Sequence, residues 1–225
     1  MTVLVAGGTG VLGQAVVREL VASGHAVTAT WVVERERERA EEDLGDVATL
    51  VRADLMQPDG AAAAVEAVDD LEAVVDLVGG FSSGPKVHES EPDDFWRMIQ
   101  LNLAPAFLLA RAAMGRLVER GGGAFVCVSA RAALRPFAGA AGYVTGKAAL
   151  LAFVQALDAE YRDAGVRCNA VLPSVIDTPA NRAGSPDADY SKWVPPAQIA
   201  KVIGFLVSEE SAPTSGAGIP VYGRA

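Results

Sequence analysis

Cysteine, aromatic residues and positive charge are scarce in this chain of 225 residues. It has two cysteines, 6% aromatic residues and a formal net charge of -9, because 28 acidic side chains outnumber 19 basic ones. Two cysteines exclude a disulfide-stabilised scaffold. The acidic balance argues against nucleic acid as a main partner, since phosphate binding needs clustered Lys and Arg. The 51% share of hydrophobic residues excludes a disordered chain.

A long apolar run and a basic leader are also missing. Apolar runs end at glycine, proline or charge far short of the ~20 residues that a membrane-spanning helix needs. The N-terminus enters an apolar run at Thr2 without the basic region of a signal peptide. Cys127 and Cys168 fall in apolar stretches, where free cysteines are usually buried and inert, and neither His25 nor His88 has metal-ligand spacing. We expect a soluble, cytoplasmic protein with no membrane partner and no metal.

Strand-like runs alternate with helical patterns along the chain. We expect strands at residues 2–6, 26–33, 47–53, 71–78, 124–129, 166–172 and 219–222, and helices at 11–22, 60–68, 93–100, 101–120, 142–164 and 196–208, with the two at 93–120 almost continuous. Helices between successive strands imply right-handed crossovers and a parallel sheet covered on both faces. The sequence therefore predicts an α/β fold, a doubly wound parallel sheet of about seven strands, as one domain over 1–225.

Two polar segments have alternative interpretations. Residues 34–39 alternate acidic and basic side chains, and a solvated helix face with weak ion pairs is favoured over a binding patch. The stretch 178–195 contains three prolines and one glycine. Because ligands of such sheets bind beyond the carboxyl ends of the strands, we expect 178–195 to be a lid over a site, with a plain connecting loop as the alternative.

A glycine-rich turn joins the first strand to the first helix. Gly7, Gly10 and Gly13 have the spacing G-x-x-G-x-x-G, which gives a tight turn, lets the backbone approach a pyrophosphate and lets helix and strand pack closely. The helix N-terminus supplies N–H groups and the positive end of a dipole. This context favours dinucleotide binding over a purely structural turn. The expected cofactor-binding residues here are Gly7, Thr9, Gly10, Val11, Leu12 and Gly13.

The end of the second strand lacks the acidic residue that commonly grips the ribose of NAD. Trp31 stands there, Glu34 comes late, and Arg35 has the charge to meet a 2′-phosphate, so the sequence leaves NAD against NADP open. After the third strand, Asp54 and the adjacent Leu55 are expected at the adenine. A turn or helix-cap acid is the alternative for Asp54.

Tyr143 and Lys147 are four residues apart in the expected helix 142–164 and therefore share one face. A phenol titrates near ~10 when unperturbed, and a nearby ammonium favours the phenolate, which lowers the pKa toward working pH. Tyr143 would then give a proton to a substrate atom while a nicotinamide delivers hydride. Lys147 would also hold the ribose hydroxyls.

These features together resemble the short-chain dehydrogenase/reductase family over nearly the full length of the chain. The likeness is carried by the glycine turn with Asp54, Asn102, Tyr143 and Lys147, and it implies a Rossmann fold with strand order 3-2-1-4-5-6-7. By resemblance, Asn102 holds a water that relays protons to Lys147, and Thr178 contacts the nicotinamide carboxamide. The resemblance also implies cofactor contacts at Val78, Gly79, Gly80 and Pro173.

Two positions depart from the family pattern. The usual Asn-Asn-Ala-Gly segment is Asp76-Leu77-Val78-Gly79 here, which weakens one support of the sheet rather than the chemistry. The family usually has Ser thirteen residues before the Tyr, and that position is Ala130, next to Ser129. Three alternatives stay open: a bulge lets Ser129 substitute, the substrate needs no Ser donor, or the chain is impaired.

A narrower likeness is to quinonoid dihydropteridine reductases, which lack that Ser. It is carried by the runs 78–81, 130–134, 171–173, 177–182 and 186–193. It implies reduction of an electron-poor quinonoid pterin, but Trp31 replaces the strand-end Asp of those enzymes, so their NADH preference is not carried over. Phe81, Phe137, Tyr190 and Trp193 are expected to wall a flat aromatic pocket, with loop or interface packing as the alternative for Phe137 and Trp193.

The sequence thus predicts an NAD(P)H-dependent oxidoreductase that transfers hydride to a carbonyl or a quinonoid or imine small molecule. The expected catalytic residues are Tyr143, Lys147, Asn102 and Ser129. The alternative is a non-catalytic dinucleotide-binding or assembly protein, which Ala130 keeps open. Family resemblance implies a homodimer or homotetramer that shares the helices at 101–120 and 142–164.

Overall fold

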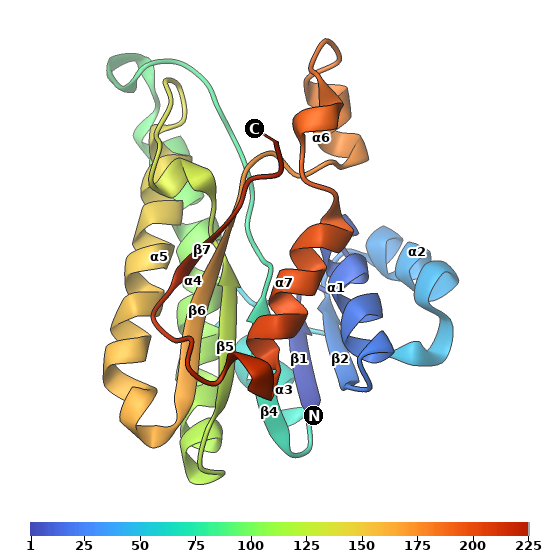
Figure 1. Ribbon diagram of the computed structural model, residues 1–225. Coiled ribbons are helices and arrows are strands. Elements are labelled where there is room, and N and C mark those ends of the chain that lie inside the picture. The colour runs from blue at the N-terminus through green and yellow to red at the C-terminus, as the bar shows by residue number, and fades with distance from the viewer. Residues whose placement is uncertain (225) are drawn as a thin grey trace.

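Seven strands make one parallel sheet in the computed structural model, which describes residues 1–224 (Figure 1). The strand order is β3-β2-β1-β4-β5-β6-β7, and each neighbouring pair is parallel. The predicted fold class and strand order are therefore confirmed. The strands are β1 (Thr2–Ala6), β2 (Ala26–Trp31), β3 (Thr49–Arg52), β4 (Leu71–Asp76), β5 (Gly123–Val128), β6 (Val166–Pro173) and β7 (Gly218–Val221).

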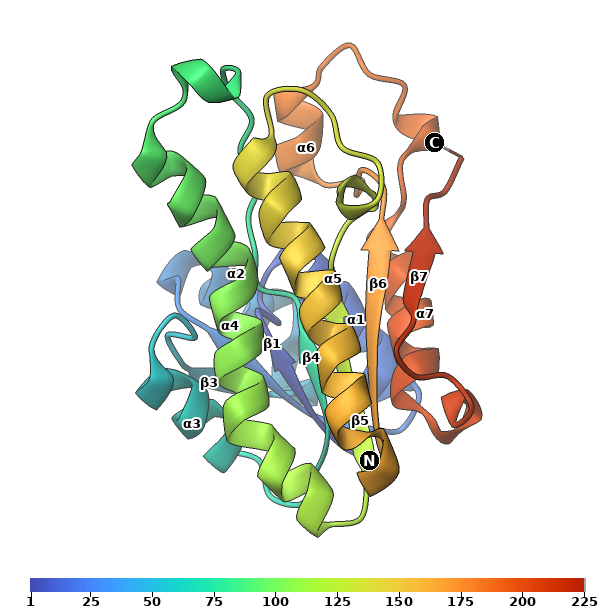
Figure 2. The same cartoon turned by 90° about the vertical axis from the view of Figure 1, so that its left-hand side faces the viewer.

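Helices cover both faces of the sheet. On one face lie α1 (Val11–Ala22), α2 (Glu34–Leu44) and α7 (Pro196–Val207), and on the other lie α3 (Pro58–Glu66), α4 (Pro92–Glu119) and α5 (Ala141–Tyr161). Figure 2 shows α4 and α5 side by side in front of the sheet. The short helix α6 (Pro179–Gly184) lies beyond the carboxyl end of β6, at the top of Figures 1 and 2.

Alternate residues of each central strand face opposite helix layers. In β4, Val74 packs in the layer of α3, α4 and α5, whereas Ala73 and Val75 pack in the layer of α1 and α7. In β5, Phe125 and Cys127 face the first of these layers. Both cysteine thiols are free and buried, and burial raises the pKa of each, as expected of unreactive thiols.

Most element ends lie within about three residues of the sequence prediction, and two differences are informative. The helices expected at 93–120 are one continuous helix, and Pro105 lies buried inside it. Proline removes one helical N–H, and packing of α4 between α3 and α5 holds the helix through that position. The second strand ends at Trp31 because Val33 is the extended residue that begins α2.

By length and composition, α4 is apolar enough to cross a membrane, and it is the one such helix among residues 1–224. Its apolar side is already used by the protein core. Leu109, Ala113 and Leu117 on this helix are fully buried in the layer that covers β4 and β5. This pattern is that of a core helix.

Candidate functional site

The glycine turn lies at the carboxyl end of β1, where the strand order reverses. Gly7 has a φ of 72°, in the left-handed region that favours glycine, and its N–H donates to Thr30 Oγ1 at 3.0 Å. A Cβ on Gly13 would lie 2.3 Å from the Gly7 carbonyl oxygen, so the approach of α1 to the turn requires glycine. Gly10 begins α1 without a side-chain cap, which leaves the first helical N–H groups available to an anion. This cradle fits a dinucleotide pyrophosphate.

The side chains of the other turn residues differ in exposure. Thr9 is 3% exposed, and its carbonyl accepts a hydrogen bond from Gln14 Nε2 at 3.1 Å. Val11 is half-exposed and Leu12 is half-buried. A ligand at this turn would therefore meet the backbone and the Val11 side chain before it met Thr9.

Trp31, at the end of β2, lies between two arginines. The guanidinium carbons of Arg37 and Arg52 are 5.4 and 5.8 Å from the centroid of the indole ring, within cation–π range. Arg37 also pairs with Glu34 and Glu41. The sequence predicts ion pairs on this helix face. One of them occupies the carboxylate of Glu34, the acid that follows β2 and could otherwise bind a ribose hydroxyl.

The remaining residues at the adenosine end are placed by turns and by the core. Arg35 and Arg52 are exposed, and neither pairs with a side-chain carboxylate of residues 1–224. Asp54 is exposed, and its Oδ1 accepts the N–H of Met56 at 3.0 Å, as a turn acid does. Leu55 is 5% exposed and packs in the core, so its backbone rather than its side chain is open to a ligand.

Tyr143 and Lys147 lie one turn apart near the N-terminus of α5. Lys147 is 6% exposed, and its Nζ donates to the Val128 carbonyl at 2.8 Å. Tyr143 is half-buried, and its ring meets that of Phe81 edge-on with centroids 5.0 Å apart. The Phe137 centroid is 6.3 Å from that of Phe81. Phe81 therefore borders the phenol, and Phe137 packs on the Phe81 ring.

Burial dominates the protonation of this pair. It raises the pKa of Tyr143 to about 12 and lowers the pKa of Lys147 to about 8. The prediction that Lys147 lowers the pKa of Tyr143 is therefore wrong for this structure, in which the ammonium bonds the Val128 carbonyl and the phenol has lost hydration. At neutral pH Tyr143 keeps its proton and Lys147 keeps its charge, which is the state in which a phenol can donate.

Asn102 fixes the segment that follows β4. It is 1% exposed, its Nδ2 donates to the carbonyls of Gly80 (3.0 Å) and Met98 (2.9 Å), and its Oδ1 accepts the Gly80 N–H at 3.2 Å. A Cβ on Gly79 would lie 2.7 Å from Asn102 Oδ1 and 2.9 Å from Lys147 Nζ. The structure thus brings Asn102, the glycine pair and Lys147 together.

Ser129 lies outside this group. It is 2% exposed, and its Oγ donates to the backbone carbonyl of Lys147 at 2.7 Å, so the hydroxyl joins β5 to α5. Pairing of β5 with β6 keeps one register up to Val128, and the Ser129 N–H continues it by donating to the Val171 carbonyl at 2.9 Å. Within residues 1–224, no bulge turns Ser129 toward Tyr143. A catalytic role for Ser129 is therefore unsupported by the geometry.

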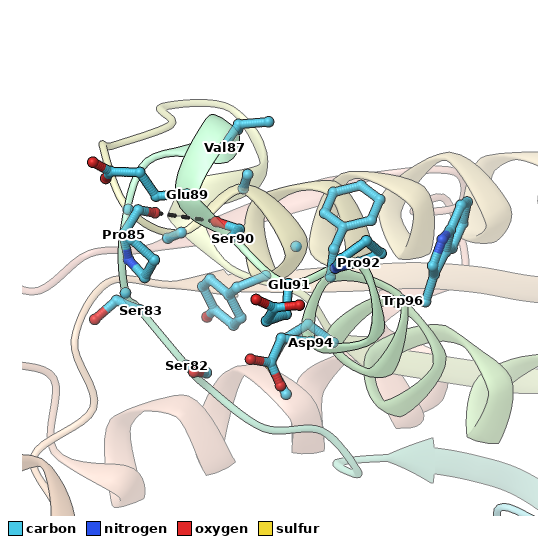
Figure 3. Close-up of a pocket in the computed structure, with 18 residues that line it drawn as sticks. Ser82, Ser83, Pro85, Val87, Glu89, Ser90, Glu91, Pro92, Asp94 and Trp96 are labelled. Atoms are coloured by element: carbon cyan, nitrogen blue, oxygen red, sulfur yellow. Dashed lines mark hydrogen bonds between the residues drawn. The ribbon is translucent and has the colours of Figure 1, made fainter.

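A cavity of about 390 Å³ opens beside the Tyr143 ring. It lies between the connection that precedes α4 and the N-terminal ends of α4 and α5 (Figure 3). Phe95 and Trp96 contribute apolar surface, and Glu91 and Asp94 bring carboxylates to its wall. The sequence analysis missed this cavity. The adjacent aromatic residues Phe95 and Trp96 at the start of a helix were the available signal in the sequence. In the structure Trp96 is 59% exposed.

Two loops are held together at the rim above Tyr143. The Gly84 N–H donates to the Gly139 carbonyl at 2.7 Å. Gly139 has a φ of 78°, and a Cβ there would lie 2.5 Å from the Gly84 carbonyl oxygen. The loop that carries Phe81 and the loop that carries Phe137 therefore meet backbone to backbone.

The segment 178–195 is more ordered than its composition suggests. Thr178 Oγ1 caps α6 by accepting the Asn181 N–H at 3.2 Å, and a parallel bridge between Ile176 and Val194 closes the segment at its base. Pro173, at the end of β6, is buried and pairs in register with β7. A short helix thus stands where the sequence predicts only a loose stretch.

The four aromatic residues expected to form one wall make two separate pairs. Tyr190 and Trp193 pack on each other inside the segment 178–195, with centroids 4.7 Å apart. Phe81 and Phe137 form the other pair, in which Phe81 also contacts Tyr143. Among residues 1–224, no ring contact joins the two pairs. One pair belongs to the rim of the Tyr143 site and the other to the packing of the segment 178–195.

Comparison with known proteins agrees with this arrangement. Residues 1–189 match the profile of the short chain dehydrogenase family. The chain is 31% identical to 3beta-hydroxysteroid dehydrogenase of Mediterraneibacter gnavus, over 82% of this chain and 69% of that protein. It is 28% identical to acetoacetyl-CoA reductase of Acinetobacter sp., over 98% of this chain and 95% of that protein.

Solved structures share the fold over almost the whole chain. A short-chain type dehydrogenase/reductase from Mycobacterium ulcerans matches with a TM-score of 0.93 at 26% identity, over 99% of this chain and 88% of that one. ElxO with NADP bound matches with a TM-score of 0.90 at 21% identity, over 98% of this chain and 96% of that one. At that identity the second likeness concerns the fold alone.

Proposed function

Because the chain belongs to the short-chain dehydrogenase/reductase family, we propose that it is an NAD(P)H-dependent reductase of a small carbonyl or quinonoid compound with Tyr143 as proton donor. The observation that carries the proposal is the group of Tyr143, Lys147 and Asn102, held together beside the glycine turn. The dinucleotide would supply hydride when bound. The glycine turn would hold its pyrophosphate, since the close approach at Gly13 leaves a backbone cradle there.

The protein residues would orient the substrate and supply the proton. Tyr143 holds its proton at neutral pH because burial raises its pKa to about 12, so it would donate to the substrate atom that gains charge. Lys147 would stabilise the phenolate left behind and hold ribose hydroxyls. Asn102 would keep the segment at Gly79 against Lys147 and support a proton relay through water.

The substrate class that fits best is a flat, electron-poor ring such as a quinonoid dihydropterin or a quinone. Ala130 offers no hydroxyl to a carbonyl oxygen, and Ser129 is committed to the Lys147 carbonyl. A quinonoid or imine acceptor depends less on a second donor than a simple ketone does. Phe81 beside Tyr143 and Phe137 beside Phe81 are each about half-exposed and would pack on the substrate ring.

We infer a preference for NADPH. No acid is free at the end of β2, because Glu34 is paired with Arg37. Arg52 lies beside Trp31, and Arg35 is exposed in the first turn of α2. These two arginines would meet a 2′-phosphate, while the indole would pack against the adenosine.

Two further parts of the proposal concern larger pieces of the molecule. The segment 178–195 would act as a lid over the nicotinamide and substrate.

A homodimer or homotetramer would form through α4 and α5, because Trp96, Phe107 and Val118 leave apolar side chains exposed on α4, and the ring centroids of Phe107 and of Phe153 on α5 are 6.1 Å apart. Sedimentation of the wild type and of Phe107→Glu tests the second part: dissociation by the charged variant is expected.

The first experiment is a parallel fluorescence titration with NADH and NADPH. Trp31 at the adenosine end and Trp193 on the lid should report binding. Saturable binding that is tighter for NADPH is expected, and Arg52→Ala should remove the preference. Equal binding of both dinucleotides would remove the proposed NADPH preference. Absent binding of both would leave the glycine turn as scaffold only and remove the reductase proposal.

A substrate screen follows, with quinonoid pterins and quinones set against simple ketones. The competing candidate is a dinucleotide-binding protein without turnover, which Ala130 favours. It predicts cofactor binding with no NADPH oxidation on any acceptor that depends on Tyr143. Oxidation that is lost in Tyr143→Phe excludes it.

A further inference from the structure

Three ionisable side chains are buried together under the Tyr143 site. Asp76 is the last residue of β4 and pairs in register with Cys127 of β5. Strand alternation puts both side chains on the face covered by α4 and α5, because Val74 and Phe125, two residues earlier in each strand, lie in that layer. Lys147 reaches into the same layer from α5. The exposures of Asp76, Cys127 and Lys147 are 2%, 0% and 6%.

The Asp76 carboxylate is held in place by the segment that touches Lys147. Its Oδ1 accepts the Val78 N–H at 3.0 Å, which fixes the turn out of β4. The next residue, Gly79, is so near the ammonium that a Cβ would lie 2.9 Å from Nζ. Lys147 Nζ donates to the Val128 carbonyl, and within residues 1–224 no hydrogen bond or ion pair joins it to Asp76, so Asp76 acts on the ammonium through space.

Few other charges face this pair. From β5 comes Cys127, whose pKa burial raises well above its usual value, so the thiol is neutral near pH 7. The helix α4 contributes the neutral amide of Asn102, and α5 contributes the protonated phenol of Tyr143. The neighbouring residue in β1 is apolar. In the described part of the chain, Asp76 is therefore the one carboxylate that the structure sets against Lys147.

Each of these two charged groups counteracts the change that burial makes in the pKa of the other. Burial raises the pKa of Asp76 to about 6, and the Val78 N–H and the Lys147 charge act against that rise. Burial lowers the pKa of Lys147 to about 8, and Asp76 acts against that fall. Without the carboxylate, burial would remove the proton from Lys147 closer to neutral pH.

We propose that Asp76 is a positioning residue that keeps the Lys147 ammonium charged inside the site and thereby sets the alkaline limit of the Tyr143 proton donor. The second half of this statement rests on the proposed reductase function. The first half concerns the protein alone and can be tested without a substrate or a cofactor. Asp76 stands where the family pattern has Asn, which carries no charge, so the proposed interaction with Lys147 depends on a residue that departs from that pattern.

The direct test is an NMR titration of the lysine ε-carbons in the free protein. The chain has four lysines, and Lys86, Lys192 and Lys201 are exposed, so the buried one is recognised by its titration at lower pH. Asp76→Asn should lower the pKa of Lys147 by about one unit. Asp163→Asn, an exposed carboxylate beyond the far end of α5, is the matched control and should change nothing. A Lys147 titration that is the same in wild type and Asp76→Asn would overturn the proposal.

A reverse titration covers the case in which Asp76→Asn does not fold. In Lys147→Met the Asp76 carboxyl loses its counter-charge, so its own pKa, followed by carboxyl-carbon NMR, should rise by about one unit. An unchanged Asp76 titration would refute the coupling by itself.

The enzymatic consequence is tested by the pH profile of kcat/KM on any acceptor that the screen finds. The alkaline limb of Asp76→Asn should move down by the same amount as the Lys147 pKa, with the plateau at lower pH little changed. A shifted Lys147 titration with an unshifted limb would keep the coupling and remove its catalytic meaning. Absence of turnover in the wild type would contradict the proposed function while the lysine titration still decides the coupling.

Discussion

The two ends of α5 each hold a buried carboxylate beside a cation, and the two arrangements behave in opposite ways. Near the N-terminal end, Asp76 faces Lys147 without touching it, and burial raises the pKa of the carboxyl to about 6. At the C-terminal end, Asp158 is equally buried, but Arg162 and Ser215 both donate to it. The pKa of Asp158 is lowered, with the Arg162 hydrogen bond as the largest cause. The two carboxyls are equally inaccessible to solvent, but Asp158 lies near the surface beside the exposed Arg162, so its hydrogen bonds outweigh desolvation, whereas desolvation dominates at Asp76.

The difference separates a structural pair from a functional one. Asp158 joins α5 to the loop before β7 through Ser215, and its partner Arg162 reaches solvent. Lys147 and Asp76 are both held from water by the fold, so neither charge is fully compensated. Strongly perturbed groups of this kind cluster at sites that move protons.

The largest expected effect is on the proton donor. Tyr143→Phe should lower turnover by about 10²–10⁴-fold, because it removes the acid and leaves the packing with Phe81 intact. Cofactor binding, followed by fluorescence, should stay within about twofold of wild type. Unchanged turnover would show that Tyr143 is not the proton donor, and the proposed catalytic role of the N-terminal end of α5 would then be wrong.

The opposite end should respond in stability and not in activity. Asp158→Ala deprives Ser215 and Arg162 of their acceptor and should cost about 1–3 kcal/mol of unfolding free energy, measured by urea denaturation. The activity per folded molecule should not change. Asp158→Asn is the matched control, since its amide oxygen can still accept from Ser215, and it should cost less than the alanine variant.

The pH dependence of stability should differ between the two pairs. The pKa of Asp76 is raised in the folded protein to about 6. Its contribution to the free energy of unfolding, roughly 3 kcal/mol, is therefore present below about pH 4 and is lost as pH rises through about 6. Lys147 has a lowered folded pKa, so stability is lost as pH falls through about 8. Relative to the double variant Asp76→Asn/Lys147→Met, the wild type should be least stable between these values. Asp158 has a lowered pKa, so its contribution should fall only in acid, below its usual range. Thermal melts from pH 4 to 10 show whether the minimum exists.

The smallest expected effect is at Ser129. Its hydroxyl bonds the Lys147 carbonyl, so Ser129→Ala should cost about 1 kcal/mol of stability, and kcat should stay within about threefold of wild type. A loss of turnover of about 10²-fold would show that Ser129 donates to the substrate after all.

The features of the site that depend on local backbone geometry could be predicted from the sequence. The spacing of Gly7, Gly10 and Gly13 between a strand and a helix, and the four-residue spacing of Tyr143 and Lys147, follow from backbone geometry, and the structure brings these residues to one edge of the sheet. The strand order, which family resemblance supplied, is confirmed by the sheet.

Contacts between distant segments could not be predicted in this way. The bond from Ser215 to Asp158 spans 57 residues, and the Asn102–Gly80 bonds span 22. The pKa of Tyr143 moved opposite to expectation because burial is a property of the packed fold. The sequence left open whether a bulge lets Ser129 substitute, and the bond of its hydroxyl to the Lys147 carbonyl on α5 could be found only in the three-dimensional structure.

The joint between Gly84 and Gly139 bears on how this site could acquire new substrates. Because the two rim loops are joined through main-chain atoms, replacing Phe81 or Phe137 alters the size and polarity of the entrance without altering the path of either loop. The proton donor below would keep its position through such changes. Evolution of specificity in this protein can therefore proceed by single side-chain replacements at the entrance, each testable on its own, while insertions in either loop would disturb both.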